Sequence, residues 1–361
     1  MSSLFEPISL RGLEVRNRAW VSPMCQYSVE ERDGVVGDWH LVHYGSFAAG
    51  GWGLVVSEAA AVLPEGRISP FDAGIWGGEH VAAWRRINAF MHSHGASTGI
   101  QIAHAGRKAS TDRWWQGVAP RTVPVEEGGW QPVGPTGARG AGEEFTTEVK
   151  ALDEDGIARV VEAFAEAAVR AEKAGFDVVE VHAAHGYLLH QFYSPLSNTR
   201  TDRWGGSFEN RVRLVLEVVD AIRQRYQGVL AVRISATDWV EEGWSVEDSV
   251  ALAQLLKEHG VDLVDCSTGG NVMAQIPVGP GYQVPFAEQV RREAGIATSA
   301  VGIIETPEQA EQIIAEGRAD AVMLGREALR DPNWPLRAAH VLGVPNEDAP
   351  WPKQRWRGYW R

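Results

Sequence analysis

The chain has few cysteines: its 361 residues include only Cys25 and Cys266. Two thiols are too few for a disulfide scaffold or for an iron–sulfur cluster held by four of them. Positive charge is also scarce, with 34 lysines and arginines against 47 aspartates and glutamates, a net charge of −13 that argues against a nucleic-acid partner. No apolar run reaches membrane-spanning length, and Met1–Arg18 is too charged for a signal peptide. We therefore expect a cytoplasmic protein without a membrane partner.

A glycine-rich dinucleotide fingerprint is missing after the first apolar run, which counts against a doubly wound sheet. Short apolar runs instead alternate with amphipathic helices along the chain. Most runs lack polar alternation, as expected where helices bury both faces of a sheet. Eight strands with intervening helices predict a (β/α)8 TIM barrel. The predicted strands are Ala19–Ser22, Leu54–Glu58, Gly99–Ala103, Asp177–His182, Leu230–Ile234, Leu263–Cys266, Thr298–Val301 and Ala321–Leu324.

Two of the predicted helices have clear boundaries. The segment Asp155–Ala174 places its apolar residues on one stripe, and Gly175 follows as a stop signal. Further along, Thr306 is an N-cap, Pro307 suits the first turn, and Gln309 stands where a capping-box residue belongs.

Three stretches fall outside the repeat. Ile8–Val15 is predicted to form a hairpin that closes the barrel floor, and the long loop Arg107–Lys150, after the third strand, should lie over the active face. The tail after Leu342 is rich in tryptophan and tyrosine, which favours a subunit interface in a homodimer or homotetramer. We expect one domain over 1–361, with a barrel core at about 18–342 and a tail at 343–361.

The run Val178–Tyr187 (VVEVHAAHGY) carries the main chemical signal. His182 and His185 follow the fourth strand, at the end of a barrel where catalytic groups gather. Two imidazole N–H donors could bind a carbonyl oxygen that gains negative charge, and Tyr187 is a protonated donor at neutral pH. A metal site is less favoured because no carboxylate or thiolate partner is obvious nearby. Hydrogen bonding of both histidines to loop backbone is the remaining alternative.

The seventh and eighth strands end in a candidate phosphate site. Gly302 follows one, and Gly325 with Arg326 follows the other, where backbone amides often bind phosphate in barrels. Glycine also ends strands for purely steric reasons. Cys25 could tune a cofactor or be inert, whereas Cys266 is expected in the core.

Several long motifs resemble the Old Yellow Enzyme family across nearly the whole chain: SPMCQY, EAAAVLPEGRISP, GIQIAHAGRKA, GFDVVEVHAAHGYLLHQFYSPLSNTRTDRWGGSFENR, VDLVDCS and LGREALRDP. The cysteine and tyrosine of SPMCQY resemble the thermophilic-like bacterial branch. Members of that branch bind FMN in a TIM barrel and reduce activated alkenes with NADPH.

The resemblance implies non-covalent FMN and assigns its contacts. Gln101 would bond the pyrimidine part of the flavin, and Arg233 would lie near its N1–C2 edge. The flavin lining is implied for Ser22, Pro23, Met24, Cys25 and Ala59, and the phosphate contacts for Gly302, Gly325 and Arg326.

The substrate side is implied in the same way. His182 and His185 would bind the carbonyl oxygen, and Tyr187 would protonate the alpha carbon after hydride passes from flavin N5 to the beta carbon. Tyr27 would help to position the substrate. Arg357 matches an arginine that members of this branch insert into the neighbouring subunit's site, although Arg355 and Trp356 are also candidates.

The implied function is an NAD(P)H-dependent FMN ene-reductase, or NADPH dehydrogenase, acting on α,β-unsaturated carbonyl or nitro compounds. A quinone or xenobiotic reductase and a noncatalytic FMN-binding sensor are alternatives. Related barrels with an iron–sulfur cluster are disfavoured by the two cysteines. A barrel aldolase or isomerase would need a strand-end lysine or carboxylate base, and no convincing one is found. No metal is expected.

Overall fold

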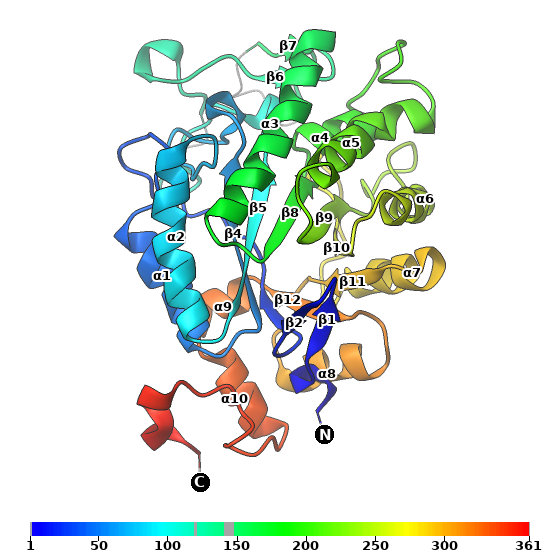
Figure 1. Ribbon diagram of the computed structural model, residues 1–361. Coiled ribbons are helices and arrows are strands. Elements are labelled where there is room, and N and C mark those ends of the chain that lie inside the picture. Colours follow the sequence, from blue (N-terminus) through cyan, green and yellow to red (C-terminus); the bar gives the residue numbers. More distant parts are fainter. Residues whose placement is uncertain (1, 119–120, 141–147, 361) are drawn as a thin grey trace.

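The computed structural model describes residues 2–118, 121–140 and 148–360, and in it eight parallel strands close on themselves (Figure 1). Their spatial order is β10-β11-β12-β3-β4-β5-β8-β9, with β9 paired back to β10. This closure confirms the predicted TIM barrel and excludes the doubly wound alternative. The strands are β3 (Ala19–Val21), β4 (Leu54–Ala61), β5 (Ser97–Ala103), β8 (Val178–Ala183), β9 (Val229–Ser235), β10 (Leu263–Ser267), β11 (Ala297–Ala300) and β12 (Ala321–Leu324).

The predicted strand boundaries agree closely with these, except that β4 continues to Ala61. The extra length follows a register shift between Ser57 and Ala59, where the pairing with β5 is irregular. Such a bulge places Glu58, the residue between them, outside the regular inward and outward alternation of side chains.

Helices cover the barrel between successive strands. Asp153 caps α3, its side chain accepting a hydrogen bond from the Gly156 amide. The Thr306 cap of α8 also forms, but the predicted capping box is wrong: Gln309 accepts from the Glu305 amide, one residue before the cap. The described helices are α1 (Asp38–Ala49), α2 (Gly78–Ser93), α3 (Glu154–Lys173), α4 (Leu188–Tyr193), α5 (Phe208–Arg223), α6 (Val246–Glu258), α7 (Val284–Ala294), α8 (Pro307–Ala315), α9 (Arg326–Arg330) and α10 (Trp334–Val341), with 3-10 turns at η1 (Ser3–Phe5), η2 (Pro64–Gly66), η3 (Gly106–Lys108), η4 (Val125–Glu127) and η5 (Lys353–Gly358).

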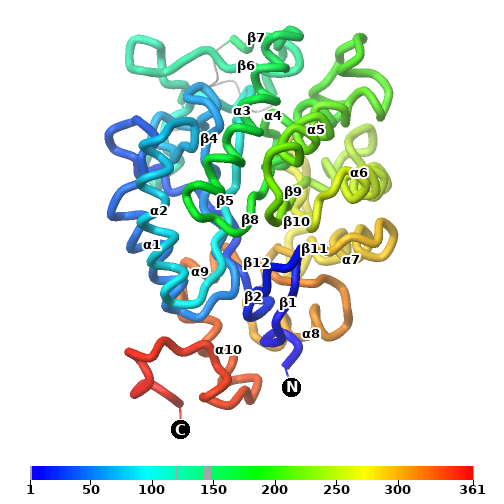
Figure 2. Tube along the Cα trace, in the orientation of Figure 1, coloured from blue at the N-terminus to red at the C-terminus, as the bar shows by residue number. Residues whose placement is uncertain are grey.

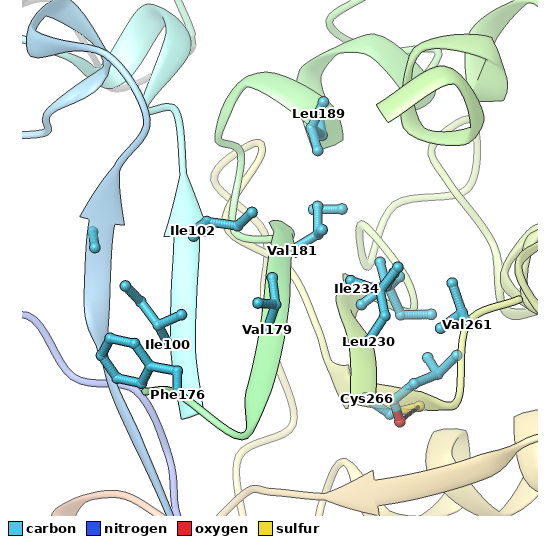
Figure 3. Packing of buried hydrophobic residues seen from close by; sticks show 14 of the residues in the cluster. Ile100, Ile102, Phe176, Val179, Val181, Leu189, Leu230, Ile234, Val261 and Cys266 are labelled. Atoms are coloured by element: carbon cyan, nitrogen blue, oxygen red, sulfur yellow. Dashed lines mark hydrogen bonds between the residues drawn. The ribbon is translucent and has the colours of Figure 1, made fainter. Parts of the chain in front are cut away.

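The core has an outer and an inner part. The outer part lies between strands and helices and includes Ile100, Val179 and Ile234, which Figure 3 shows on neighbouring strands. Cys266 belongs to it and is fully buried, as predicted. The inner part fills the lower barrel with Trp20, Leu54, Val178 and other apolar residues.

The predicted hairpin is present as β1 (Ile8–Leu10) and β2 (Leu13–Val15), joined by Arg11 and Gly12 at positive φ. Leu10 and Val15 join the inner cluster, so the hairpin closes the barrel floor. In Figures 1 and 2 it lies at the opposite end of the barrel from β6 (Val133–Gly134) and β7 (Lys150–Ala151).

The long loop 107–150 carries β6 and β7 and lies at the end of the barrel where α4 also sits (Figure 1). Its segments 119–120 and 141–147 lie outside the described residues. The aromatic tail lies at the other end, where the Trp360 ring stacks on His340 with centroids 5.1 Å apart, while Trp356 is 57% exposed. Across the described ranges, no helix has both the length and the apolarity that a membrane crossing requires.

The floor hairpin yields a stability prediction. Leu10→Ala should lower the free energy of unfolding by about 2–3 kcal/mol, because it leaves a cavity under the inner cluster. Urea denaturation followed by circular dichroism measures this. The control is Glu14→Ala on the exposed face of the same hairpin. Equal stability of the two variants would contradict the role of Leu10 as part of the floor.

Candidate active site

Side chains along a strand alternate between its two faces, and this alternation decides which of them point into the barrel. Val178, Val229 and Leu263 lie in the inner apolar cluster, and alternate residues of a strand share one face. The same inward face carries, further along each strand, Glu180 and His182 in β8, Arg233 and Ser235 in β9, and Asp265 and Ser267 in β10.

A layer of charged and polar side chains therefore lies above the apolar floor. The Gln101 amide donates to Glu180 Oε1 at 2.8 Å, and the Ser299 hydroxyl donates to Asp265 Oδ1 at 2.8 Å. Arg233 Nε lies 2.9 Å from Asp265 Oδ2, an ion pair too bent to count as a hydrogen bond for either atom. All five residues are buried.

The two carboxyl groups of this layer face one guanidinium. Burial raises the pKa of Glu180 to about 8, and the Asp265 charge adds to the rise. Burial also raises the pKa of Asp265, against the pull of Arg233. Glu180 Oε2 and Arg233 Nε remain buried without hydrogen-bond partners. Burial therefore favours the protonated form of both carboxyl groups, while Arg233 favours their charged form.

His182, His185 and Tyr187 come together directly above this layer. The His182 ring centroid is 5.2 Å from that of His185 and 4.9 Å from that of Tyr187, both in edge-on geometry. His182 pairs in register with Arg233 on β9. Its Nδ1 atom is buried without a hydrogen-bond partner. The three rings thus lie together beyond the buried layer, with His182 next to Arg233 in the sheet.

The turn that carries His185 is held by several contacts. His185 adopts φ +58°, and its amide donates to Ser235 Oγ at 2.9 Å. Its Nε2 lies 2.7 Å from Ser267 Oγ, and Lys108 Nζ donates to its carbonyl oxygen at 3.0 Å. The position of this imidazole is therefore set by strands β9 and β10 and by the loop after β5.

Both imidazoles are neutral in this setting. Burial, followed by the charge of Arg233, holds the pKa values of His182 and His185 well below the usual range. A neutral imidazole carries one N–H donor and one acceptor nitrogen. The pair can therefore donate hydrogen bonds to a ligand oxygen without carrying charge.

The segment Ser22–Tyr27 follows β3 and is held against β4. The Ser22 amide donates to Leu324 O at 3.0 Å, and the Gln26 amide donates to Glu58 Oε2 at 2.9 Å. Glu58, turned aside by the bulge, also accepts from the Tyr44 hydroxyl at 2.9 Å. Burial, then the charges of Asp72 and Glu58, raise the pKa of Cys25, so its thiol stays protonated.

A small apolar cluster adjoins Tyr187. Cys25, Tyr27, Trp130 and Tyr187 pack against a small buried cluster formed by Ile68, Ala105 and Ala109. Tyr27 adopts φ +52°, and burial raises its pKa. Trp130 comes from the long loop, whereas Trp114 and Trp115 are 52% and 43% exposed. The predicted substrate residue Tyr27 and the predicted donor Tyr187 thus share one wall.

A cavity of about 200 Å³ opens at the ends of β11 and β12. Met24, Gly302, Gly325 and Arg326 are among its lining residues. Gly302 has φ +120°, and a Cβ there would lie 2.9 Å from Gln283 Nε2, so only glycine fits. The structure therefore brings the predicted phosphate residues together with the segment after β3.

Two further predicted residues lie side by side on neighbouring strands. Ala59 and Gln101 are register partners across β4 and β5, and both are buried. Pro23 lies between Ser22 and Met24 and is partly buried. Arg357, in contrast, is not brought to the histidines of its own chain. It lies over the Trp356 ring in the tail, at the far end of the barrel (Figure 1).

Sequence reasoning missed several polar residues of the site. Glu180 and Asp265 lie within predicted strands and Ser267 directly follows one. Their odd or even spacing from His182 and Arg233, which places them on the same face of the strand, was the signal that could have identified them. Glu58 carried no such signal, because the bulge in β4 changes the parity at that point. Lys108 donates to backbone carbonyls of the loops after β8 and β10, and its Nζ lies 5.7 Å from the centroid of the Tyr187 ring.

Comparisons with known proteins show which family the chain belongs to. A model of the "NADH:flavin oxidoreductase / NADH oxidase family" matches residues 3–344. An NADPH dehydrogenase of Geobacillus thermodenitrificans is 47% identical over 354 residues, 98% of each chain. Among solved structures, an old yellow enzyme homologue from Zymomonas mobilis aligns with TM-score 0.78 and 26% identity over 99% of each chain.

A 2-naphthoyl-CoA reductase aligns with TM-score 0.84 and 25% identity, covering 96% of this chain but only 53% of that larger one. The family match and the nearly full-length relative together establish what the motifs predicted. The chain is an oxidoreductase and belongs to the NADH:flavin oxidoreductase / NADH oxidase family, that of the Old Yellow Enzymes.

Proposed function

We propose that the protein is an NADPH-dependent ene-reductase that uses non-covalent FMN to reduce the C=C bond of α,β-unsaturated carbonyl or nitro compounds. The observation that carries this proposal is the convergence of His182, His185 and Tyr187 above a buried Arg233. Such a set combines donors for a developing negative charge with a separate proton donor. The NADPH dehydrogenase from Geobacillus thermodenitrificans supports the choice of reductant.

The residues present fit FMN. The cavity lined by Gly302, Gly325 and Arg326 suits a phosphate, with a glycine that admits close approach and an arginine for its charge. Arg233, held by its ion pair with Asp265, is the residue to which the resemblance assigns the N1–C2 edge of the flavin. Gln101 is the register partner of Ala59, Met24 lines the cavity, and Ser22, Pro23 and Cys25 belong to the same segment after β3. FMN, when bound, accepts hydride from NADPH and supplies it to the alkene.

Substrate activation is assigned to the two imidazoles. An alkene conjugated to a carbonyl resists hydride attack until negative charge can move onto the oxygen. Neutral N–H donors from His182 and His185, fixed before substrate arrives, favour that charge-bearing state over the ground state. Ser267 holds the His185 ring in place for this task.

Proton delivery is assigned to Tyr187. Its phenol shares an apolar wall with Tyr27 and Cys25, next to the His182 ring. A phenol in such a wall stays protonated at neutral pH and can give its proton to the alpha carbon. Tyr27 is proposed to orient the substrate against this wall.

The proposed function is tested by anaerobic visible absorption of the purified protein, with NADPH added first and cyclohexenone second. Loss of the flavin colour with NADPH and its recovery with the enone support both half-reactions. A protein that loses its colour but does not regain it would leave only a flavin reductase. A protein that stays colourless after FMN is supplied would contradict the proposal entirely.

The Tyr187→Phe variant separates the two half-reactions. We expect alkene reduction to slow by about 10²- to 10⁴-fold because the proton donor is lost. Flavin reduction by NADPH should stay close to wild type, since it needs no proton from Tyr187. Stopped-flow absorbance measures each step. Equal losses in both steps would remove Tyr187 from the donor role.

The neutral histidines yield a pH prediction. A lowered pKa means that the neutral, ligand-binding form of an imidazole persists as pH falls. The second-order rate constant for enone reduction by pre-reduced protein should therefore show no acid limb near the usual histidine pKa of about 6.5, and should decline only at lower pH. Circular dichroism over the same range checks that the fold persists. A limb centred at 6.5 is the contradicting result.

We also propose that Arg357 enters the substrate site of a neighbouring subunit. Arg355 donates to Asn333 Oδ1 at 2.7 Å within its own chain, whereas the Arg357 guanidinium lies over Trp356. Arg357→Ala should raise the KM for enone several-fold without changing flavin content, and Arg355→Ala should not. Steady-state kinetics measures the KM, and light scattering measures the oligomeric state. A monomer, or equal KM values for both variants, would overturn this assignment.

A further inference from the structure

A fully buried imidazole–carboxylate pair lies behind the turn that carries His185 and Tyr187. His190 in α4 and Asp238, after β9, have no solvent exposure. His190 Nε2 lies 3.0 Å from Asp238 Oδ1. On the other side of the ring, the Gly186 amide donates to His190 Nδ1 at 3.0 Å. The pair therefore links Asp238 to the backbone between two residues of the proposed site.

These contacts allow only one proton arrangement on the ring. Nδ1 accepts from an amide, so it carries no proton, and Nε2 must carry the proton that it donates to the carboxylate. The other oxygen, Asp238 Oδ2, accepts from the Ser194 hydroxyl at 2.6 Å and the Trp244 amide at 3.0 Å. Burial lowers the pKa of His190 even though Asp238 opposes this, which agrees with a neutral ring.

The peptide held by His190 is unusually constrained. His185 and Gly186 follow each other at φ +58° and +71°. A Cβ on Gly186 would lie 2.3 Å from the Gly270 carbonyl oxygen, so this backbone runs directly against the loop after β10. The Gly186 carbonyl accepts from Gln191 Nε2 at 2.6 Å. Its amide and its carbonyl are thus both fixed by side chains of α4.

We propose that Asp238 and His190 are positioning residues for the reaction. By holding His190 in the tautomer with Nδ1 unprotonated, Asp238 provides the acceptor for the Gly186 amide and thereby fixes the relative placement of His185 and Tyr187. Neither residue touches the reacting atoms. The inference rests on the proposed function for the roles of His185 and Tyr187, but the tautomer itself rests only on the contacts above.

The isosteric variant Asp238→Asn tests this idea. Its oxygen can still accept from Ser194 and Trp244, which turns its NH₂ group towards His190 Nε2. That nitrogen must then become the acceptor, and the proton moves to Nδ1, where it opposes the Gly186 N–H. Because small misplacements of reacting groups are costly, we expect the alkene half-reaction to slow by about 10- to 100-fold.

Two measurements accompany the rate. The ¹⁵N chemical shifts of the His190 ring, assigned by their loss in His190→Asn, should show an exchange of protonated and unprotonated nitrogens in Asp238→Asn. His190→Asn keeps an acceptor near Nδ1 and should retain more alkene reduction than His190→Phe, which keeps a ring without one. Circular dichroism and bound-flavin absorbance show that each variant folds.

The matched control is Asp220→Asn, which makes the same change in another histidine–carboxylate pair. That pair joins α5 to the end of α6, where His259 Nδ1 lies 2.6 Å from Asp220 Oδ1. It should leave both half-reactions unchanged. An unchanged tautomer or a wild-type alkene rate in Asp238→Asn would overturn the proposal, as would equal rates for His190→Asn and His190→Phe. Failure of the proposed function is distinguishable, because the wild-type protein would then not regain its flavin colour with cyclohexenone, while the tautomer exchange in Asp238→Asn still appears.

Discussion

Successive side chains of a β-strand face opposite ways, and closing eight strands commits one face of each to a narrow interior. In this protein that interior changes character along its axis. Apolar residues such as Val178 and Leu263 fill the lower part, Glu180, Arg233 and Asp265 follow, and His182 stands at the mouth. Two residues along a strand are enough to pass from one layer to the next. The site is therefore a continuation of the barrel core.

The same constraint explains what the sequence could predict. The apolar runs identified all eight strands because helices bury their outer faces, and the glycines after β11 and β12 marked a cavity that the structure also contains. The motifs predicted the family correctly. The inward polar residues Glu180 and Asp265 were overlooked. Each is a single polar residue between apolar neighbours in the sequence, and its partners lie on other strands, whose register is known only from the structure.

Other features depend on tertiary contacts that local pattern does not encode. The bulge in β4 places Glu58 against the amide of Gln26, and this pairing joins residues 32 positions apart. The wrong capping-box prediction at Gln309 has a similar cause. The Gln309 side chain accepts from the Glu305 amide and donates to the Ile303 carbonyl, rather than bonding the amide of the Thr306 cap. The turn after β8 is held by hydrogen bonds to His190 of α4 and Ser235 of β9, so its geometry depends on several elements together.

The closed floor has a consequence for how protons enter the barrel. Leu10 and Val15 of the hairpin, together with Trp20 and Leu54, exclude water from the lower end. The ionisable groups of the layer above, Glu180 and Asp265, can therefore exchange protons with solvent only through the mouth beside His182. Any molecule that covers the mouth isolates them, and the number of protons enclosed at that moment stays fixed until it leaves.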